Sequence, residues 1–223
     1  MNRDEEFEEI LPVLNELAKK YGKKLAFKIL ARNNLFESLE SENKTLVGDV
    51  RFYDGQFVPY ERYEQTLYTS DIALLPLHDN KFNRAKSDLK FLECAACGTV
   101  ALASPVVYGS VVQDGENGMI FYDVKEFAQK LEFLIENPDK RRDMATTAYE
   151  YVKHNRLMSQ HYEERLDWYK ELFAKWDELT EQAQARIDKE SPRFKDEVPV
   201  ETTQRIYSPA GNNNQPAEII IPV

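Results

Sequence analysis

Apolar residues in the first part of the chain alternate between helical spacing and short continuous runs. A first helix is predicted by apolar residues at spacings of three and four: Phe7, Ile10, Leu11, Leu14 and Leu17. It ends at Gly22, after a pair of lysines. The run KLAFKILA that follows is bounded by polar residues and predicts a buried strand.

Strand and helix patterns keep alternating after this point. Further strands are predicted at residues 50–55 (VRFYDG), 71–77 (DIALLPL), 99–104 (TVALAS) and 116–123 (ENGMIFYD). Helices are predicted at residues 60–70 and 87–98, and a loop at 78–85. This order predicts an α/β fold in which a Rossmann-like parallel sheet carries helices on both faces.

The last third of the chain is expected to be helical and then irregular. Two helices are predicted between Val124 and Leu157, with a break at 137–140 where Pro138 suits a first helical turn. Residues 157–189 repeat apolar and aromatic side chains and predict one long amphipathic helix. Beyond it, Pro, Asn and Thr predict a flexible tail, residues 190–223, whose apolar end IIIPV could add to a sheet edge. The Rossmann-like domain is thus assigned to residues 1–156.

Charge and composition exclude several classes of protein. The chain has 29 basic and 39 acidic residues, so its net charge of -10 disfavours nucleic acid and anionic lipid as partners. Neither a cationic start with an apolar run nor a membrane-spanning apolar stretch is seen. Two cysteines give no disulfide framework. We expect a cytoplasmic protein, with any attachment to the inner membrane made through a partner.

The two cysteines stand in a C-x-x-C spacing, at Cys94 and Cys97. A redox pair needs the N-terminal end of a helix, whereas these residues lie near the C-terminal end. A structural zinc ion needs four ligands, and the three histidines are scattered along the chain. The favoured interpretation is that both cysteines are small buried packing residues, with zinc or redox function as the alternative.

The N-terminal end of the same predicted helix carries residues that could bind a ligand. The loop before it carries Asn83, Arg84 and Lys86, and the helix is expected to begin at Ser87. Parallel sheets bind ligands at the carboxyl ends of their strands, and a helix N-terminus favours phosphate. The pattern therefore indicates an anionic ligand, with ordinary loop charges as the alternative. Glu93 could accept hydrogen bonds from sugar hydroxyls, or it could be a solvated helix residue.

Two segments of the chain resemble a known family. The segment LKFLECAACGTVALAS and the turn DGENGMIF resemble the donor-binding half of retaining glycosyltransferases with the GT-B fold, a group that includes relatives of glycogen and sucrose synthases. The resemblance runs from about Phe7 to Tyr151. It implies one half of a GT-B fold and a glycosyltransferase of the hexosyltransferase type, used in bacterial glycan biosynthesis.

The resemblance also implies roles for individual residues. Glu93 would bind the ribose hydroxyls of a UDP- or GDP-sugar. The diphosphate would be held on the residues at the helix start: Asn83, Lys86, Ser87, Asp88, Leu89 and Lys90. No metal cofactor is expected, because cations and the helix dipole would stabilise the leaving nucleoside diphosphate. Weaker candidates are Gln56, Phe57 and Val58 near the base, and Tyr108 in a loop that faces the donor or simply packs.

The chain departs from the family in two ways. The acidic residue expected eight positions before Glu93 is Ala85, which leaves the contact to the transferred sugar unassigned. The chain begins almost at the first helix of the family's second domain, so that domain's opening strand and the loop of the family's catalytic arginine have no counterpart here. The family's first Rossmann-like domain has no counterpart either, so we expect an acceptor domain on the same or another chain. The isolated chain is expected to bind donor weakly at most. The alternative is a non-catalytic remnant or protein-interaction module that uses the long helix and the tail.

Overall fold

The computed structural model describes residues 4–30, 33–47 and 58–190. The described residues up to Glu163 form one compact unit, and those from Glu164 to Glu190 form a second. The strand predicted at 50–55 and the candidates Gln56 and Phe57 lie outside the described residues, as does nearly all of the predicted tail.

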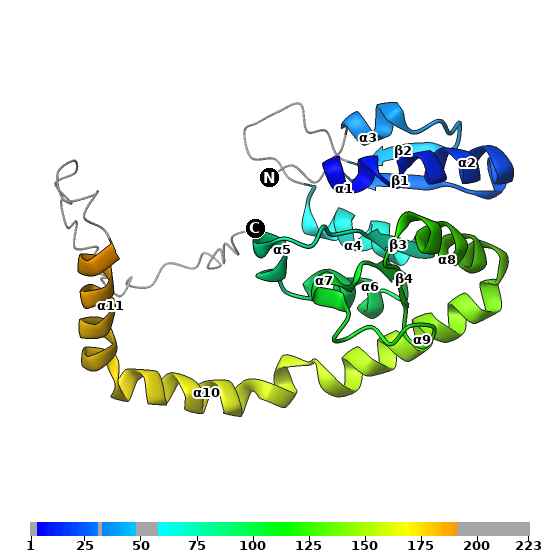
Figure 1. Ribbon diagram of the computed structural model, residues 1–223. Helices are drawn as coiled ribbons and strands as arrows, with labels where there is room; N and C mark the ends of the chain where they lie inside the picture. Colours follow the sequence, from blue (N-terminus) through cyan, green and yellow to red (C-terminus); the bar gives the residue numbers. More distant parts are fainter. Residues whose placement is uncertain (1–3, 31–32, 48–57, 191–223) are drawn as a thin grey trace, which may run out of the picture. The chain divides into compact units, whose positions relative to one another are not determined.

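The first unit begins with helices and two short strands (Figure 1). Its first elements are α1 (Asp4–Glu8), α2 (Leu11–Tyr21), the 3-10 turn η1 (Gly22–Lys24), β1 (Phe27–Leu30), α3 (Asn33–Ser38), β2 (Lys44–Val47) and α4 (Tyr60–Tyr68). The single predicted N-terminal helix is therefore two helices, and Pro12 lies in the first turn of the second one. Gly22 ends α2 with a φ of 53°, a backbone conformation that glycine adopts without steric cost. The strand β2 was not predicted.

The strands form two parallel sheets. β1 pairs with β2, with Phe27 opposite Lys44. The second sheet has the order β3-β4-β5, made of β3 (Ile72–Leu75), β4 (Val100–Ala103) and β5 (Met119–Ile120). The short helices α5 (Lys81–Arg84) and α7 (Pro105–Tyr108) and the helix α6 (Leu89–Ala96) fill the connections. Both sheets are parallel, as the alternating pattern predicted.

Helices cover both faces of the β3-β4-β5 sheet. All four residues of β4 are buried, and successive side chains belong to two different apolar clusters. Val100 and Leu102 join the cluster that includes α2 and α8 (Val124–Glu136), whereas Ala101 and Ala103 join the one that includes α6 and α9 (Pro138–Asn155). This alternation is the two-sided burial expected of a central parallel strand, and it confirms the predicted fold class.

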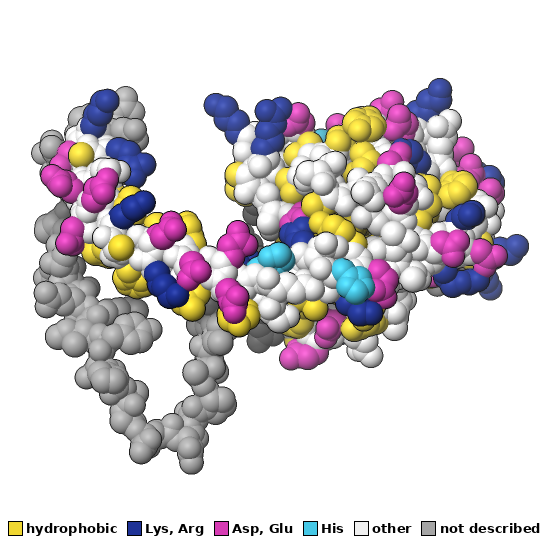
Figure 2. Space-filling model, turned by 90° about the horizontal axis from the view of Figure 1, so that it is seen from below, with side chains coloured by type: hydrophobic (Ala, Val, Ile, Leu, Met, Phe, Trp, Pro, Cys, Tyr) yellow, Lys and Arg dark blue, Asp and Glu magenta, His cyan; other side chains and the backbone are white. Residues whose placement is uncertain are grey.

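The C-terminal helices are α10 (Met158–Ala174) and α11 (Trp176–Glu190). They meet at Lys175, so the stretch predicted as one helix is two. Most of their large apolar side chains are exposed, and Figure 2 shows hydrophobic atoms interspersed with charged ones along these helices. The residues concerned include Tyr162, Leu166, Trp168, Tyr169, Phe173 and Trp176. Within the described ranges, no helix is long and apolar enough to cross a membrane.

Candidate functional site

The loops at the carboxyl ends of β3 and β4 are tied to one another. The Ser104 side chain, at the end of β4, accepts a hydrogen bond from the backbone N–H of Leu77 at 2.9 Å. The segment predicted as a loop after β3 contains α5, which is capped by Asn80: its side-chain oxygen accepts from the Asn83 N–H at 2.8 Å. These hydrogen bonds therefore hold together the loops at the carboxyl ends of the strands, where a parallel sheet is expected to bind ligands.

Asn83, predicted to lie on the phosphate side, is only 3% exposed. Its Nδ2 donates to Glu6 Oε1 at 2.7 Å and to the His78 carbonyl at 2.9 Å, so its amide joins α1 to the loop after β3. Nearby, the exposed Arg84 pairs with Asp79 at 2.7 Å, and Ala85 is the C-cap of α5. A phosphate contact by Asn83 stays a prediction.

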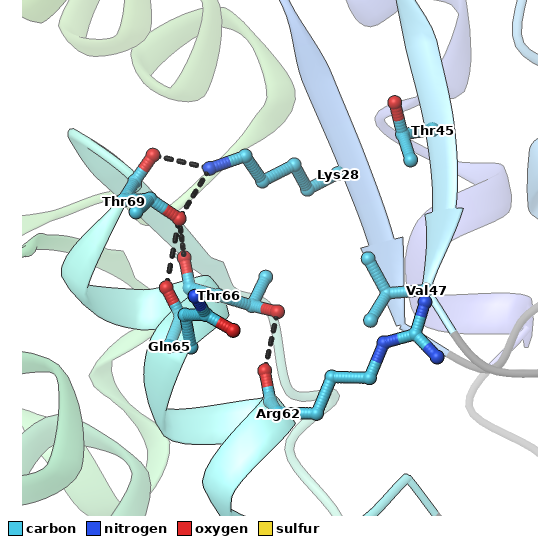
Figure 3. Close-up of a pocket in the computed structure, with 7 residues that line it drawn as sticks. All are labelled: Lys28, Thr45, Val47, Arg62, Gln65, Thr66 and Thr69. Atoms are coloured by element: carbon cyan, nitrogen blue, oxygen red, sulfur yellow. Dashed lines mark hydrogen bonds between the residues drawn. The ribbon is translucent and has the colours of Figure 1, made fainter.

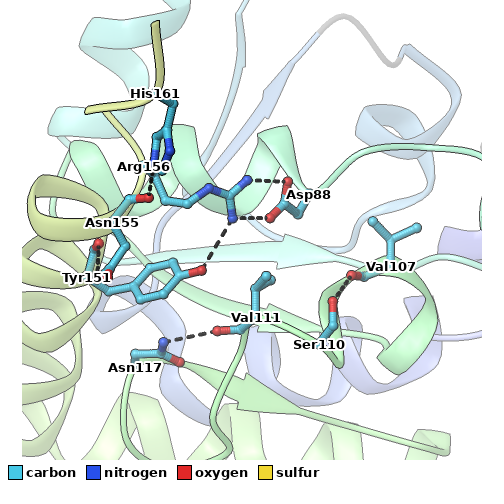
Figure 4. A network of polar contacts seen from close by, with 9 residues as sticks. All are labelled: Asp88, Val107, Ser110, Val111, Asn117, Tyr151, Asn155, Arg156 and His161. Atoms are coloured by element: carbon cyan, nitrogen blue, oxygen red, sulfur yellow. Dashed lines mark hydrogen bonds and ion pairs between the residues drawn. The ribbon is translucent and has the colours of Figure 1, made fainter. Parts of the chain in front are cut away.

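The helix α6 begins at Leu89 with Asp88 at its N-cap position, two residues later than the start predicted at Ser87. Asp88 accepts two hydrogen bonds from Arg156, at 2.6 and 3.0 Å (Figure 4). Arg156 also donates to the Tyr151 hydroxyl at 3.3 Å. The hydrogen bonds to Asp88, and then the one to Tyr151, raise the pKa of Arg156 above its ordinary value. The guanidinium thus offsets the negative charge at the start of α6.

The remaining candidates of this segment lie in different surroundings. Ser87 is exposed, and the side chain of Leu89 is 52% exposed. The Lys86 ammonium lies 5.0 Å from the centre of the Phe82 ring. These groups frame the N-terminal end of α6, where backbone N–H groups lack partners within the helix.

Glu93 is part of a compact polar group with α4. Its Oε2 accepts a hydrogen bond from the Tyr63 hydroxyl at 2.6 Å and pairs with the Lys90 ammonium at 3.0 Å. The Lys90 ammonium also lies 4.4 Å from the centre of the Tyr63 ring. The Glu93 side chain is 16% exposed. Burial, followed by the bond to Glu93, raises the pKa of Tyr63, so the phenol stays protonated and holds the carboxylate in place.

The cysteines occupy different environments at the other end of α6. Cys94 is 1% exposed, and burial raises the pKa of its thiol to about 12. Cys97 is the C-cap residue and is partly exposed, which corrects the expectation that both are buried. Burial raises its pKa as well. Both thiols are therefore protonated at neutral pH, as expected of packing residues rather than a redox pair. No group of three metal-ligating side chains occurs in the residues that the structure describes.

The loop after β4 contains a strained residue. Val107, in α7, has a φ of 72°, a conformation that is unfavourable for a β-branched side chain. Such strain is found most often at functional sites. Tyr108 beside it is 2% exposed and packs in the core. The DGENG turn that follows is held by Asn117, whose side chain accepts from the Gln113 N–H at 2.7 Å and donates to the Val111 carbonyl at 3.1 Å.

A separate cavity of about 200 Å³ lies between the β1-β2 sheet and α4 (Figure 3). Its lining combines two cations with threonine hydroxyls: Lys28, Thr45, Val47, Arg62, Gln65, Thr66 and Thr69. Lys28 is engaged within it, because its ammonium donates to the Thr69 hydroxyl at 2.7 Å. None of the candidate residues predicted from the sequence lines this cavity.

Sequence reasoning missed three features near the candidate site. These are Tyr63, the Asp88–Arg156 pair and the strain at Val107. Tyr63 lies in a run read only for helical spacing, and its partner is 30 residues away. Arg156 lies 68 residues from Asp88, so no local pattern joins the two.

Comparison with known proteins gives one family and several solved structures. The family model described as "Glycosyl transferase-like" matches residues 23–171. No curated protein matches the chain. Among solved structures, a mutant of TarM from S. aureus, in complex with Fondaparinux, alpha-GlcNAc-glycerol and UDP, has a TM-score of 0.56 and 15% identity over 75% of this chain and 33% of that one.

Two further structures are similar. Sucrose-phosphate synthase from Thermosynechococcus elongatus has a TM-score of 0.50 and 16% identity over 74% of this chain and 43% of its own. The C-terminal domain of the glycosyl transferase group 1 family protein LpcC from Francisella tularensis has a TM-score of 0.42 and 19% identity, over 70% of this chain and 65% of that one. The chain thus spans between 33% and 65% of the length of these structures.

Proposed function

We propose, from the premise that the chain belongs to the glycosyl transferase-like family, that the loops at the carboxyl edge of β3 and β4 bind a nucleoside-diphosphate sugar. The observation that carries the proposal is the placement of Glu93. It lies in the second turn of α6, it is mostly buried, and Tyr63 and Lys90 fix one of its carboxylate oxygens. A fixed carboxylate is suited to accepting the two hydroxyls of a ribose.

The diphosphate would lie at the N-terminal end of α6. Partnerless backbone N–H groups and the positive end of the helix dipole favour an anion there. Lys86 and Ser87 stand just before this end and would add a cation and a hydroxyl. Asp88 would repel phosphate if its charge were uncompensated, but it is held by two hydrogen bonds from Arg156. That pairing compensates the negative charge beside the proposed phosphate position.

In the complete enzyme, the proposed reaction is transfer of the sugar to an acceptor with retention of anomeric configuration. The chain's own groups would stabilise the departing nucleoside diphosphate electrostatically, without a metal ion. An acceptor domain, on the same or another polypeptide, would supply the rest of the site. UDP and GDP are the first nucleotides to test, and UDP is the one named for the S. aureus structure.

Calorimetric titration of the purified chain with UDP, GDP and their sugars tests the proposal. We expect binding of one nucleotide and a loss of about 10-fold or more in affinity for Glu93→Gln, because a charge-assisted bond to ribose is worth about 1.5–3 kcal/mol. The matched control is Glu61→Gln, an exposed carboxylate on α4, which should bind like the unaltered chain. Absence of heat with every nucleotide, or equal affinity for both variants, would sink the donor-site proposal.

A second candidate function is a protein-interaction module. The observation in its favour is the exposure of large aromatic side chains on α10 and α11, where Phe173 is 74% exposed and Trp176 is 62% exposed. Aromatic residues of this kind are enriched at protein interfaces. The titration separates the two functions, because an interaction module has no reason to bind UDP or GDP in a way that depends on Glu93.

A further inference from the structure

The cavity between the β1-β2 sheet and α4 is basic, although the chain as a whole is acidic. Lys28 and Arg62 are both among its lining residues, and none of the described residues that line it is an aspartate or a glutamate. The complete chain, in contrast, has a net charge of -10. Two cations that share a cavity without a carboxylate favour an anionic ligand.

Regular elements form both walls of this cavity. Lys28 of β1 lies opposite Thr45 of β2 in the parallel register, and Val47 follows two residues later, so the three side chains share one face of the sheet. Arg62 and Gln65 are three residues apart on α4 and share one side of that helix. Figure 3 shows Lys28 extending from β1 towards α4, and Arg62 extending from α4 towards Val47. The strands and the helix therefore place both cations at the cavity.

The Lys28 ammonium is held at one end of the cavity. It donates to the Thr69 hydroxyl at 2.7 Å and also to the Thr69 carbonyl. Thr69 is the C-cap residue of α4, and a cation is favourable there because the last carbonyl groups of a helix lack partners within it. An ammonium has three N–H donors. Lys28 therefore has a fixed position and one donor that a ligand can use.

Three other lining groups have hydrogen-bonding capacity that the described residues do not use. The Arg62 guanidinium, which has five N–H donors, makes no hydrogen bond or ion pair with any described residue. The same holds, within the described ranges, for the Thr45 hydroxyl and the Gln65 side-chain amide. All three residues are exposed, so these groups are accessible to a molecule that enters from solvent.

The size of the cavity limits the ligand. Its volume is about 200 Å³, which equals the liquid volume of about seven water molecules at about 30 Å³ each. Pockets for drug-sized molecules are larger, at about 300–1,000 Å³, so the cavity is too small for a complete nucleoside-diphosphate sugar. A phosphate group fits this space. Its oxygens can accept several hydrogen bonds at once, including two parallel ones from an arginine.

We propose that this cavity binds the phosphate group of a small anion, either inorganic phosphate or a small phosphate ester. Arg62 would donate two parallel hydrogen bonds to the phosphate, and Lys28 would supply the second positive charge. The neutral polar groups of the lining would bind the remaining oxygens. The site is distinct from the proposed donor site, because none of the donor candidates lines the cavity. Tyr63, the neighbour of Arg62 on α4, bonds Glu93 of α6 instead.

Titration of the isotope-labelled full chain with inorganic phosphate, glycerol phosphate and acetate, followed by NMR spectroscopy at constant ionic strength, tests the proposal. We expect phosphate to shift the amide signals of Thr45 and residues 62–69, and to bind about 10-fold more tightly than acetate because it can accept from both cations. Arg62→Gln should weaken phosphate binding by about 10-fold or more, since charge-assisted hydrogen bonds are lost. The matched control Arg165→Gln removes an equal charge from an exposed position on α10 and should leave the affinity unchanged.

Thr45→Val is a second variant, and it leaves the charge of the cavity unchanged. It should weaken phosphate binding about 3-fold, through loss of one neutral hydrogen bond. A response to either phosphate compound that depends on Arg62 supports the proposal, and comparison of the two compounds shows whether the free ion or the ester is preferred.

Three results would overturn the proposal. Equal effects of Arg62→Gln and Arg165→Gln would mean that phosphate responds only to net charge. Signal changes confined to the start of α6 would place the phosphate outside the cavity, and equal affinity for acetate would exclude a phosphate-specific site. None of these measurements uses a nucleotide, so the outcome is separate from that of the donor-site proposal.

Discussion

Asp88 and Arg156 show how one long-range ion pair can fix the start of a helix. Two hydrogen bonds, at 2.6 and 3.0 Å, join them across 68 residues of sequence, and both side chains are mostly buried. Fork-like pairs of this kind are geometrically specific, and loss of one partner leaves the other without compensation. The start of α6 therefore depends on a residue in the short connection between α9 and α10.

The first prediction concerns this pair. Asp88→Asn should lower the free energy of unfolding by about 1–3 kcal/mol, because the bonds to a charged acceptor are lost. Urea unfolding monitored by far-UV circular dichroism measures the change. The control is Asp79→Asn, which removes the exposed pair with Arg84 and should leave stability unchanged. Equal effects of the two substitutions would mean that the Asp88–Arg156 pair contributes no more than a surface contact.

A second prediction follows from the raised pKa of Cys94. Its folded pKa, about 12, is above that of an unfolded cysteine, so the unfolded chain loses the proton first as the pH rises. The stability that the protonated Cys94 thiol contributes is fully present below the pKa of the unfolded cysteine. The free energy of unfolding then falls as the pH increases from about 9 towards 12, by about 1.4 kcal/mol per pH unit.

The measurement compares the unaltered chain with Cys94→Ala at pH 8 and pH 10. The unaltered chain should lose about 1–2 kcal/mol more between these two pH values than the variant does. Cys97→Ala, at a partly exposed position, is the matched control and should behave more like the unaltered chain. If all three proteins lose the same amount, Cys94 is accessible to hydroxide in the folded state.

Single residues were predictable from the sequence to different degrees. That the cysteines are not a redox pair was predicted from the position of the C-x-x-C near the C-terminal end of a helix, and the structure gives both thiols a raised pKa, for which burial is the largest cause. The partners of Glu93 and Asp88 could not be predicted, because they come from α4 and from the residue that follows α9, far along the chain. Side-chain contacts between distant elements depend on packing geometry that local patterns do not contain.

At the scale of elements, the turn before β5 depends on close approach of the backbone. A Cβ at Gly118 would lie 3.0 Å from Val112 Cγ1 and 3.1 Å from the Ala101 carbonyl oxygen. One of these neighbours is backbone of the fully buried strand β4, which has little room to move. Glycine is therefore required at this position for space.

The third prediction is that Gly118→Ala destabilises the chain by about 1–3 kcal/mol through overcrowding. Thermal unfolding measures it, and the second substitution Val112→Ala should restore part of the loss by removing the nearer contact. Gly109→Ala, which would meet the Pro105 carbonyl oxygen at 2.8 Å, serves as a comparison at a loop position. Unchanged stability of Gly118→Ala would show that β5 can shift away from β4.

Elements with strong periodicity were predicted, and weakly patterned ones were not. The strand β4 and the helices α8 and α9 were expected from apolar runs and from the break at Pro138. The strand β2 was missed because two of its four residues, Lys44 and Thr45, are polar. The helix α5 was missed because it has only four residues, which are polar apart from one aromatic side chain and show no apolar periodicity. The break between α10 and α11 at Lys175 was not predicted, because no Gly or Pro stands there. The division of the strands into two sheets depends on pairings between distant segments.

At the scale of the whole molecule, both tryptophans of the chain lie in the C-terminal helices. Trp168 is in α10 and Trp176 is in α11, and they are 54% and 62% exposed. The sequence up to residue 157 has none. Tryptophan fluorescence therefore reports on the helices from residue 158 onwards, while circular dichroism reports on the entire chain.

The fourth prediction uses this separation. Thermal unfolding followed by tryptophan emission should show little change in wavelength, because these rings are already in water, whereas far-UV circular dichroism should show a cooperative transition. Binding of a partner to α10 and α11 would move the emission to shorter wavelength. A cooperative emission shift at the midpoint seen by circular dichroism, in the chain alone, would mean that the two tryptophans are buried in solution.

The φ of 72° at Val107 predicts which substitution a selection for higher thermal stability should find. Strain of this kind costs on the order of 1–3 kcal/mol. The ψ of -43° at this residue lies outside the left-handed helical region, so a search for heat-resistant variants should readily find glycine at this position. If the loop after β4 serves the donor, those same variants should lose turnover in the complete enzyme. Position 107 is where thermostability and activity are expected to be traded against one another.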